Sequence, residues 1–375
     1  MKKFFLRSII ILIVIFSSLI SYLSIIGIET NKLNSQISHL VKNINKDLNI
    51  ELRKIKLVLD PFNFVLNAKT VGPKLKIKEK ELDIQNIQTT ISINSFLKNK
   101  FFLSNLQIST NSLKIENVIA FLRKYKNNPE FFILEKVIKK GYLISNINLE
   151  FDDKGNIKNN FRIKGFIKDG KLSLLKNNQI EKLDFIFDIT KDNYQINDIN
   201  LFFNEIPILS REIVIKKNKD NFLIEGSFEN KDLIVEKKII DTYFNRISSK
   251  YKINDLNFKS KNNFKFKLNN KLKINELEFL SKIKLNNLKF THNLELIRFF
   301  PNIEKDIGIK DHSVTVKISK DKLSIKGSGN ILLQEKEDDI EYSINKKNNQ
   351  YKFKTSLLSS NPIKIDFLGY QKMKI

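Results

Sequence analysis

The chain has 375 residues, a formal net charge of +25 and no cysteine. A protein without cysteine forms no disulfide and has no thiolate nucleophile or cysteine-ligated metal. The charge would suit nucleic acid or an anionic membrane surface. Only seven of the 66 basic residues are arginine, however, and arginine is the side chain that binds phosphates and base edges bidentately. The composition therefore argues against a nucleic-acid-binding protein.

The first segment of the chain has the features of a membrane anchor. Lys2, Lys3 and Arg7 precede a stretch from Ser8 to Ile28 that carries no charge. About 20 apolar residues in a helix match the thickness of the hydrocarbon core. The stretch is longer than the apolar part of a signal peptide, and no A-x-A cleavage site follows it. Residues 1–28 are predicted to be a signal-anchor transmembrane helix with a cytoplasmic basic tip.

The rest of the chain then lies outside the inner membrane, in the periplasm of a bacterium with two membranes. Residues 30–48 are predicted to form an amphipathic helix, because apolar residues recur there at three- and four-residue spacing. From Ile50 the period falls to two, which indicates short strands. A second helical stretch is predicted at 116–140, interrupted at 127–129 and capped by Gly141. Residues 29–141 are therefore predicted to be a helix-capped β region.

Strands dominate the sequence from 142 to 375, and two short helices are predicted near 236–248 and 292–306. The clearest hairpin is NFKFKLNNKLKI (263–274), in which apolar residues and lysines alternate on both sides of Asn269-Asn270. The alternation slips phase at 275–276 and at 286–287, which we interpret as bulges or turns. Apolar residues still alternate at 363–367, so an exposed strand edge and an incomplete C-terminus are expected.

The predicted fold class is mostly β. A transmembrane helix is followed by an extended, curled antiparallel sheet of about 18 to 20 strands with an apolar groove and a few short amphipathic helices. So few helices cannot cover the apolar face of that many strands. The strands therefore form either a two-sheet sandwich or a sheet whose apolar face lines a groove, and periodicity alone does not separate these alternatives.

The order of features in the first half of the chain resembles the AsmA-like superfamily, in particular its YhdP and TamB type. The residues that carry the resemblance are the anchor, the amphipathic helix, IELRKIKLVLDPFNF (50–64), the stretch from 87 to 110, and the segment 139–175. The resemblance implies a long β-sheet that is apolar inside and polar outside. It also implies phospholipid movement, or its control, between the inner and outer membranes. YhdP-like chains are typically far longer than this one.

No catalytic or metal-binding pattern is evident. The three histidines, His39, His292 and His312, are far apart in the sequence, and none lies in an H-E-x-x-H setting. The segments DDKGN (152–156) and GSG (327–329) are interpreted as turns, or for GSG as a turn or bulge. The acidic run EKEDD (335–339) is interpreted as a solvated connection. The chain is therefore predicted not to be an enzyme and to need no cofactor or metal.

The remaining functional feature is the apolar stripe of the 263–285 region, predicted to line a lipid-binding groove. Its members are Phe264, Phe266, Leu268, Leu272, Ile274, Leu277, Phe279, Ile283 and Leu285. The expected partners are phospholipid acyl chains, the inner membrane and, at the C-terminal edge, outer-membrane or periplasmic proteins. The alternative is a periplasmic scaffolding or assembly factor for outer-membrane components, which acts through exposed β-edges.

Overall fold

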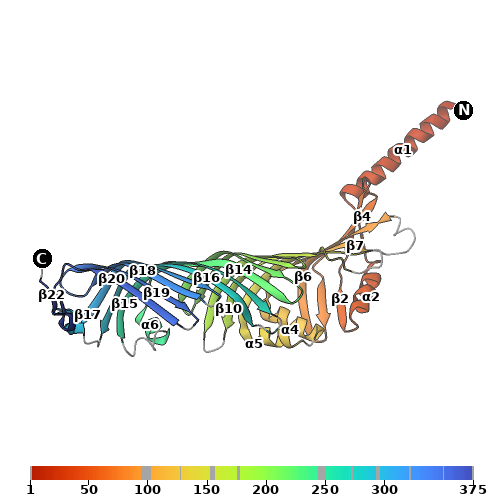
Figure 1. Cartoon of the computed structure of the whole chain (residues 1–375). Coiled ribbons are helices and arrows are strands. Elements are labelled where there is room, and N and C mark those ends of the chain that lie inside the picture. Colours follow the sequence, from red (N-terminus) through yellow and green to blue (C-terminus); the bar gives the residue numbers. More distant parts are fainter. Residues whose placement is uncertain are drawn as a thin grey trace. The chain divides into compact units, whose positions relative to one another are not determined.

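The computed structural model is mostly β and contains one long antiparallel sheet of 20 strands (Figure 1). It describes residues 2–93, 103–126, 128–152, 157–174, 178–243, 251–269, 271, 273–292, 296–320, 322–348 and 350–373. Together with an N-terminal apolar helix and few short helices, this confirms the predicted fold class. The chain divides into two compact units. Unit 1 is Met1–Asn177 with Leu183–Lys191, and unit 2 is Asn178–Lys182 with Asp192–Ile375.

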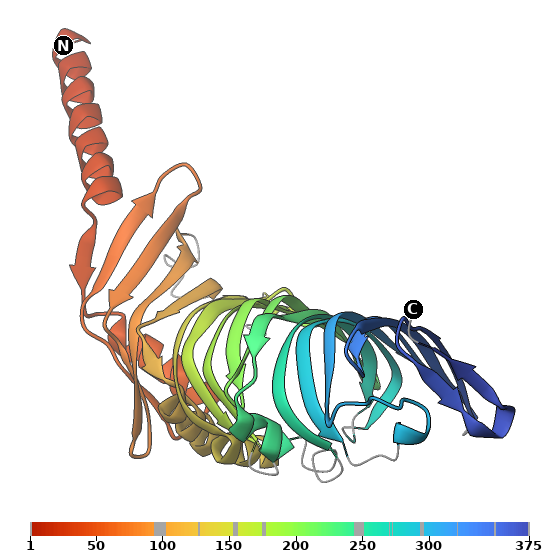
Figure 2. The same cartoon turned by 90° about the vertical axis from the view of Figure 1, so that its left-hand side faces the viewer.

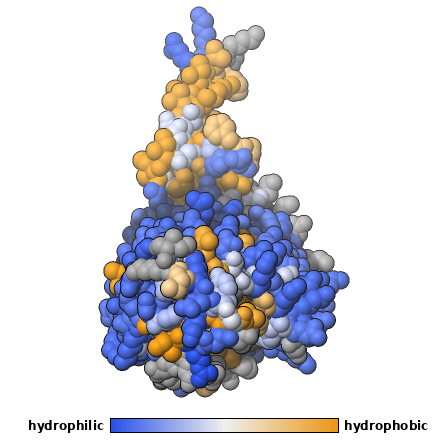
Figure 3. All heavy atoms as spheres, turned by 60° about the vertical axis from the view of Figure 1, so that its left-hand side comes forward, coloured by the Kyte–Doolittle hydropathy of each residue, from blue (hydrophilic) through white to orange (hydrophobic). Residues whose placement is uncertain are grey.

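Helix α1 (Lys2–Ile25) is long and apolar enough to cross a membrane. Many of its exposed side chains are large and apolar, and they form the orange areas of this helix in Figure 3, below a hydrophilic tip. The helix ends three residues before the predicted boundary at Ile28. Gly27 adopts a left-handed conformation (φ 75°), and its N–H donates to the carbonyl of Tyr22 at 3.0 Å. Glycine favours this conformation just after a helix, and strand β1 (Ile28–Thr30) follows directly.

Besides α1, the described part of unit 1 combines antiparallel strands with three helices. The helices are α2 (Asn34–Ile44), α4 (Ile115–Tyr125) and α5 (Pro129–Val137). The strands are β2 (Leu48–Glu51), β3 (Ile55–Asp60), β4 (Val65–Val71), β5 (Lys74–Ile77), β6 (Lys80–Ser92), β7 (Leu103–Thr110), β8 (Leu113–Lys114), β9 (Ile138–Glu150), β10 (Arg162–Ser173) and most of β11 (Gln179–Ile189). The predicted helices at 30–48 and 116–140 are confirmed in their central parts.

Two of these helices cover the sheet of unit 1. Leu33, which immediately precedes α2, packs with Ile55 and Ala68 of β3 and β4. Phe121 of α4 packs with Ile77 and with neighbouring residues of β6. Ile77 is 0% exposed, so this part of the sheet has a closed apolar core.

Gly141 lies inside β9 and does not cap a helix, in contrast to the prediction. The helical hydrogen bonding of α5 ends at Val137, and β9 pairs with β10 from Ile138 onward. Gly141 has a φ of 151°, and a Cβ there would lie 2.7 Å from Ile115 Cδ1. The glycine is therefore required by a close approach of α4 to the strand.

Unit 2 consists of long strands that pair with their neighbours in sequence. They are β12 (Asn193–Phe203), β13 (Ile206–Lys217), β14 (Asn221–Ile234), β15 (Tyr251–Asn269), β16 (Ile274–His292), β17 (Asp306–Ser319), β18 (Lys322–Leu332), β19 (Glu337–Lys347) and β20 (Gln350–Leu358). Short elements complete the unit, namely α6 (Lys237–Tyr243), the 3₁₀ turns η2 (Leu296–Arg298) and η3 (Asp366–Leu368), and the separate hairpin of β21 (Ile363–Ile365) and β22 (Tyr370–Lys372).

The hairpin predicted at 263–274 is confirmed, but its loop is longer than two residues. β15 ends at Asn269 and β16 begins at Ile274, with Leu268 paired to Ile274. The side chain of Asn269 accepts hydrogen bonds from the N–H groups of Lys271 and Lys273, at 3.0 and 2.9 Å. An asparagine that binds backbone N–H groups in this way stabilises a four-residue loop.

Strands β12 to β17 of unit 2 carry irregularities that reverse the side-chain alternation. Asp198 in β12 and Asp311 in β17 have positive φ values of 52° and 44°. Register shifts occur between β13 and β14, β14 and β15, β15 and β16, and β17 and β18. The two predicted phase slips, at 275–276 and 286–287, are among these bulges. A bulge bends its strand, and the strands of this unit are strongly curved (green to blue in Figure 2).

Two predictions in the last third of the chain are wrong, and a third is confirmed in part. In place of a helix at 292–306, the described residues form η2 and turns, because Pro301 has no N–H and strand ends bind the backbone around it. GSG (327–329), predicted to be a turn or bulge, is not a turn but lies inside β18, with Gly329 opposite the bulge at Asp311 and His312 of β17. EKEDD is not simply a solvated connection, because Asp338 is 2% exposed and accepts hydrogen bonds from Ser359 and Asn361.

The apolar residues at 363–367 do not form a free edge of the large sheet. Ile363–Ile365 pairs with Tyr370–Lys372 in a hairpin of its own. The hairpin is closed by η3 and by Gly369, whose φ is 61°. The free edge in the described part of unit 2 is instead β20, which pairs with β19 on one side.

Candidate functional site

Most of the apolar stripe lies on one face of the β15–β16 hairpin. Phe264 is paired with Phe279 across the two strands, and directly paired residues of antiparallel strands share a face. We call this the inner face, and the opposite face, which carries Lys265 and Lys282, the outer face. Phe266 and Leu268 follow Phe264 on the inner face. Leu272 lies outside the described residues, and Leu277 lies in the bulge beside Glu276.

The inner face continues over the neighbouring strands. Phe228 of β14 lies beside Phe264, with ring centroids 6.1 Å apart, and Phe264 lies 6.0 Å from Phe266. On the other side, Phe279 is paired with Ile318 of β17, which is paired with Leu323 of β18. These neighbours are not among the site residues predicted from the sequence, although their strands show the same alternation. Others that share the face are Ile196, Ile213, Ile224, Val314, Val316, Ile325 and Ile344.

The apolar stripe is only partly covered. Ile274 is 53% exposed. The other described members are half-buried, namely Phe264, Phe266, Leu268, Leu277, Phe279, Ile283 and Leu285. Ile283 lies at the centre of the long strand β16, where an aliphatic residue of a closed sandwich would be fully buried. The inner face of unit 2 therefore presents accessible apolar surface.

Leu285 has a different environment from the rest of the stripe. Helix α6 and Val235, two residues before it, form a buried cluster with β15, consisting of Val235, Ile239, Ile240 and Leu256. Leu285 and Leu288 pack against this cluster. Leu285 therefore belongs to a local core beneath α6, whereas Phe264, Phe266 and Phe279 are not part of that cluster.

A band of small polar residues crosses the middle of the inner face. This polar band consists of Asn230, Ser260, Asn262 and Ser281, all of which are buried. The Ser260 hydroxyl donates to Asn230 Oδ1, and Asn262 Nδ2 donates to Ser260 Oγ at 2.8 Å. The amides of Asn230 and Asn262 also donate to the backbone carbonyls of Phe258 and Phe228. The band divides the apolar face into two parts, and the sequence analysis did not identify it.

His312 and Tyr342 also lie on the inner face, where two glycines make room for them. The two rings stack with centroids 5.5 Å apart. A Cβ on Gly327 would lie 2.2 Å from the Tyr342 ring, and a Cβ on Gly329 would lie 2.9 Å from His312 Nδ1. His312 is 2% exposed, and burial lowers the pKa of its imidazole. The glycines of GSG therefore accommodate two aromatic side chains.

The outer face is charged and its charges are paired between strands. Lys216 of β13 and Lys265 of β15 both lie near Glu225 of β14, at 3.3 and 3.5 Å. Lys216 in particular lowers the pKa of the Glu225 carboxyl through a hydrogen bond. Further pairs across strand junctions are Lys259–Asp232, Lys261–Glu229, Lys284–Asp311, Lys289–Asp306 and Lys310–Glu337. The outer face is thus suited to contact with water.

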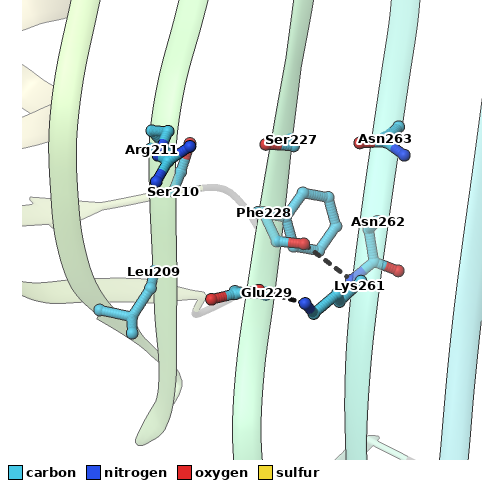
Figure 4. Close-up of a pocket in the computed structure, with 9 residues that line it drawn as sticks. All are labelled: Leu209, Ser210, Arg211, Ser227, Phe228, Glu229, Lys261, Asn262 and Asn263. Carbon is cyan, nitrogen blue, oxygen red and sulfur yellow. Dashed lines mark hydrogen bonds and ion pairs between the residues drawn. The ribbon is translucent and has the colours of Figure 1, made fainter.

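A pocket of about 400 Å³ spans β13, β14 and β15 (Figure 4). Arg211, Glu229 and Lys261 contribute to its lining, and Figure 4 shows the Glu229–Lys261 ion pair. A charged lining does not suit an acyl chain. Within the described residues, no group of three or more His, Asp or Glu side chains is placed to hold a metal ion. The candidate functional site is therefore the inner face of unit 2.

Comparisons of the chain with protein-family models, with curated proteins and with solved structures found no match.

Proposed function

We propose that this protein is a membrane-anchored, lipid-binding protein of the bacterial periplasm, of the AsmA-like kind. It would take part in phospholipid transport between the inner and outer membranes, or in the control of that transport. The observation that best supports the proposal is the incompletely buried apolar inner face of unit 2, opposite a charged outer face. Helix α1, with its apolar surface, is the proposed anchor in the inner membrane.

The proposed mechanism is desolvation without covalent chemistry. An acyl chain that leaves water for the inner face gains about 0.8 kcal/mol for each buried methylene. The headgroup stays in water, where its charge keeps its hydration. Phe264, Phe266 and Phe279 supply apolar contact to the chain. Leu285 has a structural role in this proposal, because it packs against the cluster beneath α6.

The first test is site-specific photocrosslinking in cells. A benzophenone amino acid replaces Phe266 or Phe279 on the inner face, and Lys282 on the outer face serves as the matched control. After irradiation, mass spectrometry of the purified full-length protein detects attached phospholipid. Lipid adducts are expected at Phe266 and Phe279 and not at Lys282. Equal adduct formation at all three positions, or none at any position, would contradict the proposal.

The second test places a charge in the proposed acyl path. Ile283→Glu should leave the protein folded, because Ile283 is only half-buried, but should reduce the amount of co-purified phospholipid. Lys282→Glu is the control, since it adds a carboxylate one residue away on the outer face. Lys282 is preferable to Lys284, which pairs with Asp311 at 3.7 Å. Unfolding of Ile283→Glu, together with a lipid-free wild-type protein, would indicate a closed apolar core.

A further inference from the structure

Strand β20 is the most exposed strand of unit 2. Every residue from Gln350 to Leu358 is exposed except Leu357, which is half-buried. Phe353 is 67% exposed and Tyr351 is 56% exposed, and the two rings stack with centroids 6.2 Å apart. Within the described residues, β20 pairs with β19 and with no strand on its other side. Its second row of N–H and C=O groups is thus available to another strand.

The residues that follow β20 do not cover this edge. Asn361 Nδ2 donates to the carbonyl of Lys336 and to Asp338 Oδ1, at 2.7 and 2.8 Å. The carbonyl of Pro362 accepts a hydrogen bond from Gln334, and the N–H of Lys364 donates to the carbonyl of Phe299. These bonds hold the following segment against the residues around β19 and η2, and they leave β20 exposed.

The two faces of β20 continue the two faces of the sheet. Phe353 is paired with Ile344, which is paired with Ile325, so Phe353 extends the apolar inner face. Lys352 and Lys354 lie on the outer face, opposite Asn345 and Ser343 of β19. A strand that joined this edge would therefore need apolar side chains on one face and side chains compatible with two lysines on the other.

Charge pairing elsewhere in the unit indicates what those side chains are. Lysines of the outer face lie beside an acidic residue of an adjacent strand at the junctions of β13 with β14, β14 with β15, and β16 with β17. Lys352 and Lys354 lie directly opposite Asn345 and Ser343, and the nearest outer-face carboxylate of β19, Glu341, lies opposite Ser356. Within the described residues neither lysine forms an ion pair with it. If this lysine–carboxylate pairing continues to a strand added beside β20, that strand carries carboxylates opposite Lys352 and Lys354.

We propose that the free edge of β20 binds an extended segment of another polypeptide, in which acidic and apolar residues alternate. The segment adds an antiparallel strand, pairs its carboxylates with Lys352 and Lys354, and places its apolar side chains beside Tyr351 and Phe353. The lysines also make the edge selective, since exposed edge lysines oppose unintended strand pairing. This inference does not depend on lipid binding.

A second copy of the chain fits the edge less well. An antiparallel β20–β20 pair that aligns all nine residues of the strand places Lys354 opposite Lys354. Like charges directly opposite each other destabilise a strand pair. An acidic partner removes this repulsion and a second copy does not.

Fluorescence anisotropy with the full-length protein in detergent tests the proposal. The probes are labelled peptides of the length of β20: one alternates Val and Glu, one alternates Val and Lys, and one is the Val-Glu peptide with a central proline. We expect the Val-Glu peptide to bind about tenfold more tightly than the Val-Lys peptide. The central proline should abolish binding, because proline has no N–H and disrupts strand pairing.

Charge-reversal variants make the test specific to the edge. The double variant K352E/K354E should prefer the Val-Lys peptide. The double variant K282E/K317E changes the net charge by the same amount on internal strands and should keep the wild-type preference. Equal binding of both charged peptides, no binding of either, or the same reversal in K282E/K317E would overturn the proposal. So would a dimer, detected by sedimentation velocity, that Phe353→Asp dissociates, because it would assign the edge to a second copy.

Discussion

In unit 1, α2 and α4 lie over the strands and bury side chains of β3 to β6, whereas in unit 2 the described helical cover is the seven-residue α6. The consequence is visible in the exposure of apolar residues on the two faces. Ile77 of unit 1 is 0% exposed, while Phe266 on the inner face of unit 2 is half-buried. Strands of the same alternating type therefore give a closed core or an accessible surface, depending on the helices that accompany them. The difference suggests a structural role for the face in unit 1 and a binding role for the face in unit 2.

The largest expected effect is that of a charge in the core of unit 1. Ile77→Asp buries an unpaired carboxylate and should reduce the free energy of unfolding by about 4 kcal/mol. Phe266→Asp in unit 2 should cost about 1 kcal/mol, since the carboxylate can reach water. Hydrogen exchange with mass spectrometry measures protection in each unit separately. A loss of protection in unit 2 after Phe266→Asp as large as that in unit 1 after Ile77→Asp would remove the distinction between the units.

The next effect concerns the helical cover itself. Ile37 of α2 packs against the cluster of Leu33, Ile55 and Ala68. Ile37→Asp should destabilise unit 1 by about 2 kcal/mol through loss of that contact, and β3 and β4 should exchange faster. Ser35→Asp is the control, because Ser35 is exposed in the first turn of the same helix. If the two variants had equal thermal midpoints, α2 would not be needed as a cover.

The sequence predicts the strands of this fold better than it predicts what covers them. Alternation in 263–287 correctly predicts the β15–β16 hairpin and two of its three register shifts, because period-two patterns depend on local geometry. Alternation does not predict what covers a face, since a sandwich and an open sheet need the same pattern. The helix predicted at 292–306 fails because tertiary hydrogen bonds, such as that of Glu304 N–H to the carbonyl of Leu333, override its apolar spacing.

The candidate site is predicted less completely than the fold. The sequence identifies Phe264, Phe266 and Phe279 from one hairpin, but the neighbouring Phe228 and Ile318 join them only through pairing between strands. Ser260 and Asn262 appear in the sequence as interruptions of an apolar pattern. Their hydrogen bonds to Asn230, 30 residues away from Ser260 in sequence, require the register of β14 and β15. Such long-range pairing has no local signal.

A smaller effect is expected from pH in unit 2. Burial lowers the pKa of His312 below its ordinary value of about 6.5. As the pH falls, the unfolded chain therefore binds a proton before the folded chain does, and stability decreases below the ordinary pKa. The urea midpoint of unit 2 should fall between pH 7 and pH 5. The variant His312→Phe should show a weaker pH dependence than the wild type, and an unchanged dependence would contradict the assignment to His312.

The smallest effects are expected at inter-strand ion pairs, which occur in both units. Arg162 forms a hydrogen-bonded ion pair with Asp188 in unit 1 and lowers the pKa of that carboxyl. In unit 2, Lys216 lowers the pKa of the Glu225 carboxyl in the same way. Asp188→Asn and Glu225→Gln should each cost less than about 1 kcal/mol at neutral pH, because the basic partner of each pair is exposed to water. Chemical denaturation measures both, and a much larger cost in one unit would show that these ion pairs differ between the units.

Strands β13 to β19 each pair with the strand before and the strand after them in the sequence. Stability in such a stack is close to a sum over nearest neighbours, as in repeat proteins. Duplication or loss of a complete hairpin would preserve the direction of all other strands and change the length of the stack by about 10 Å. An inserted single strand would reverse the direction of every strand after it. The length of the sheet can therefore change in steps of two strands while the fold stays the same.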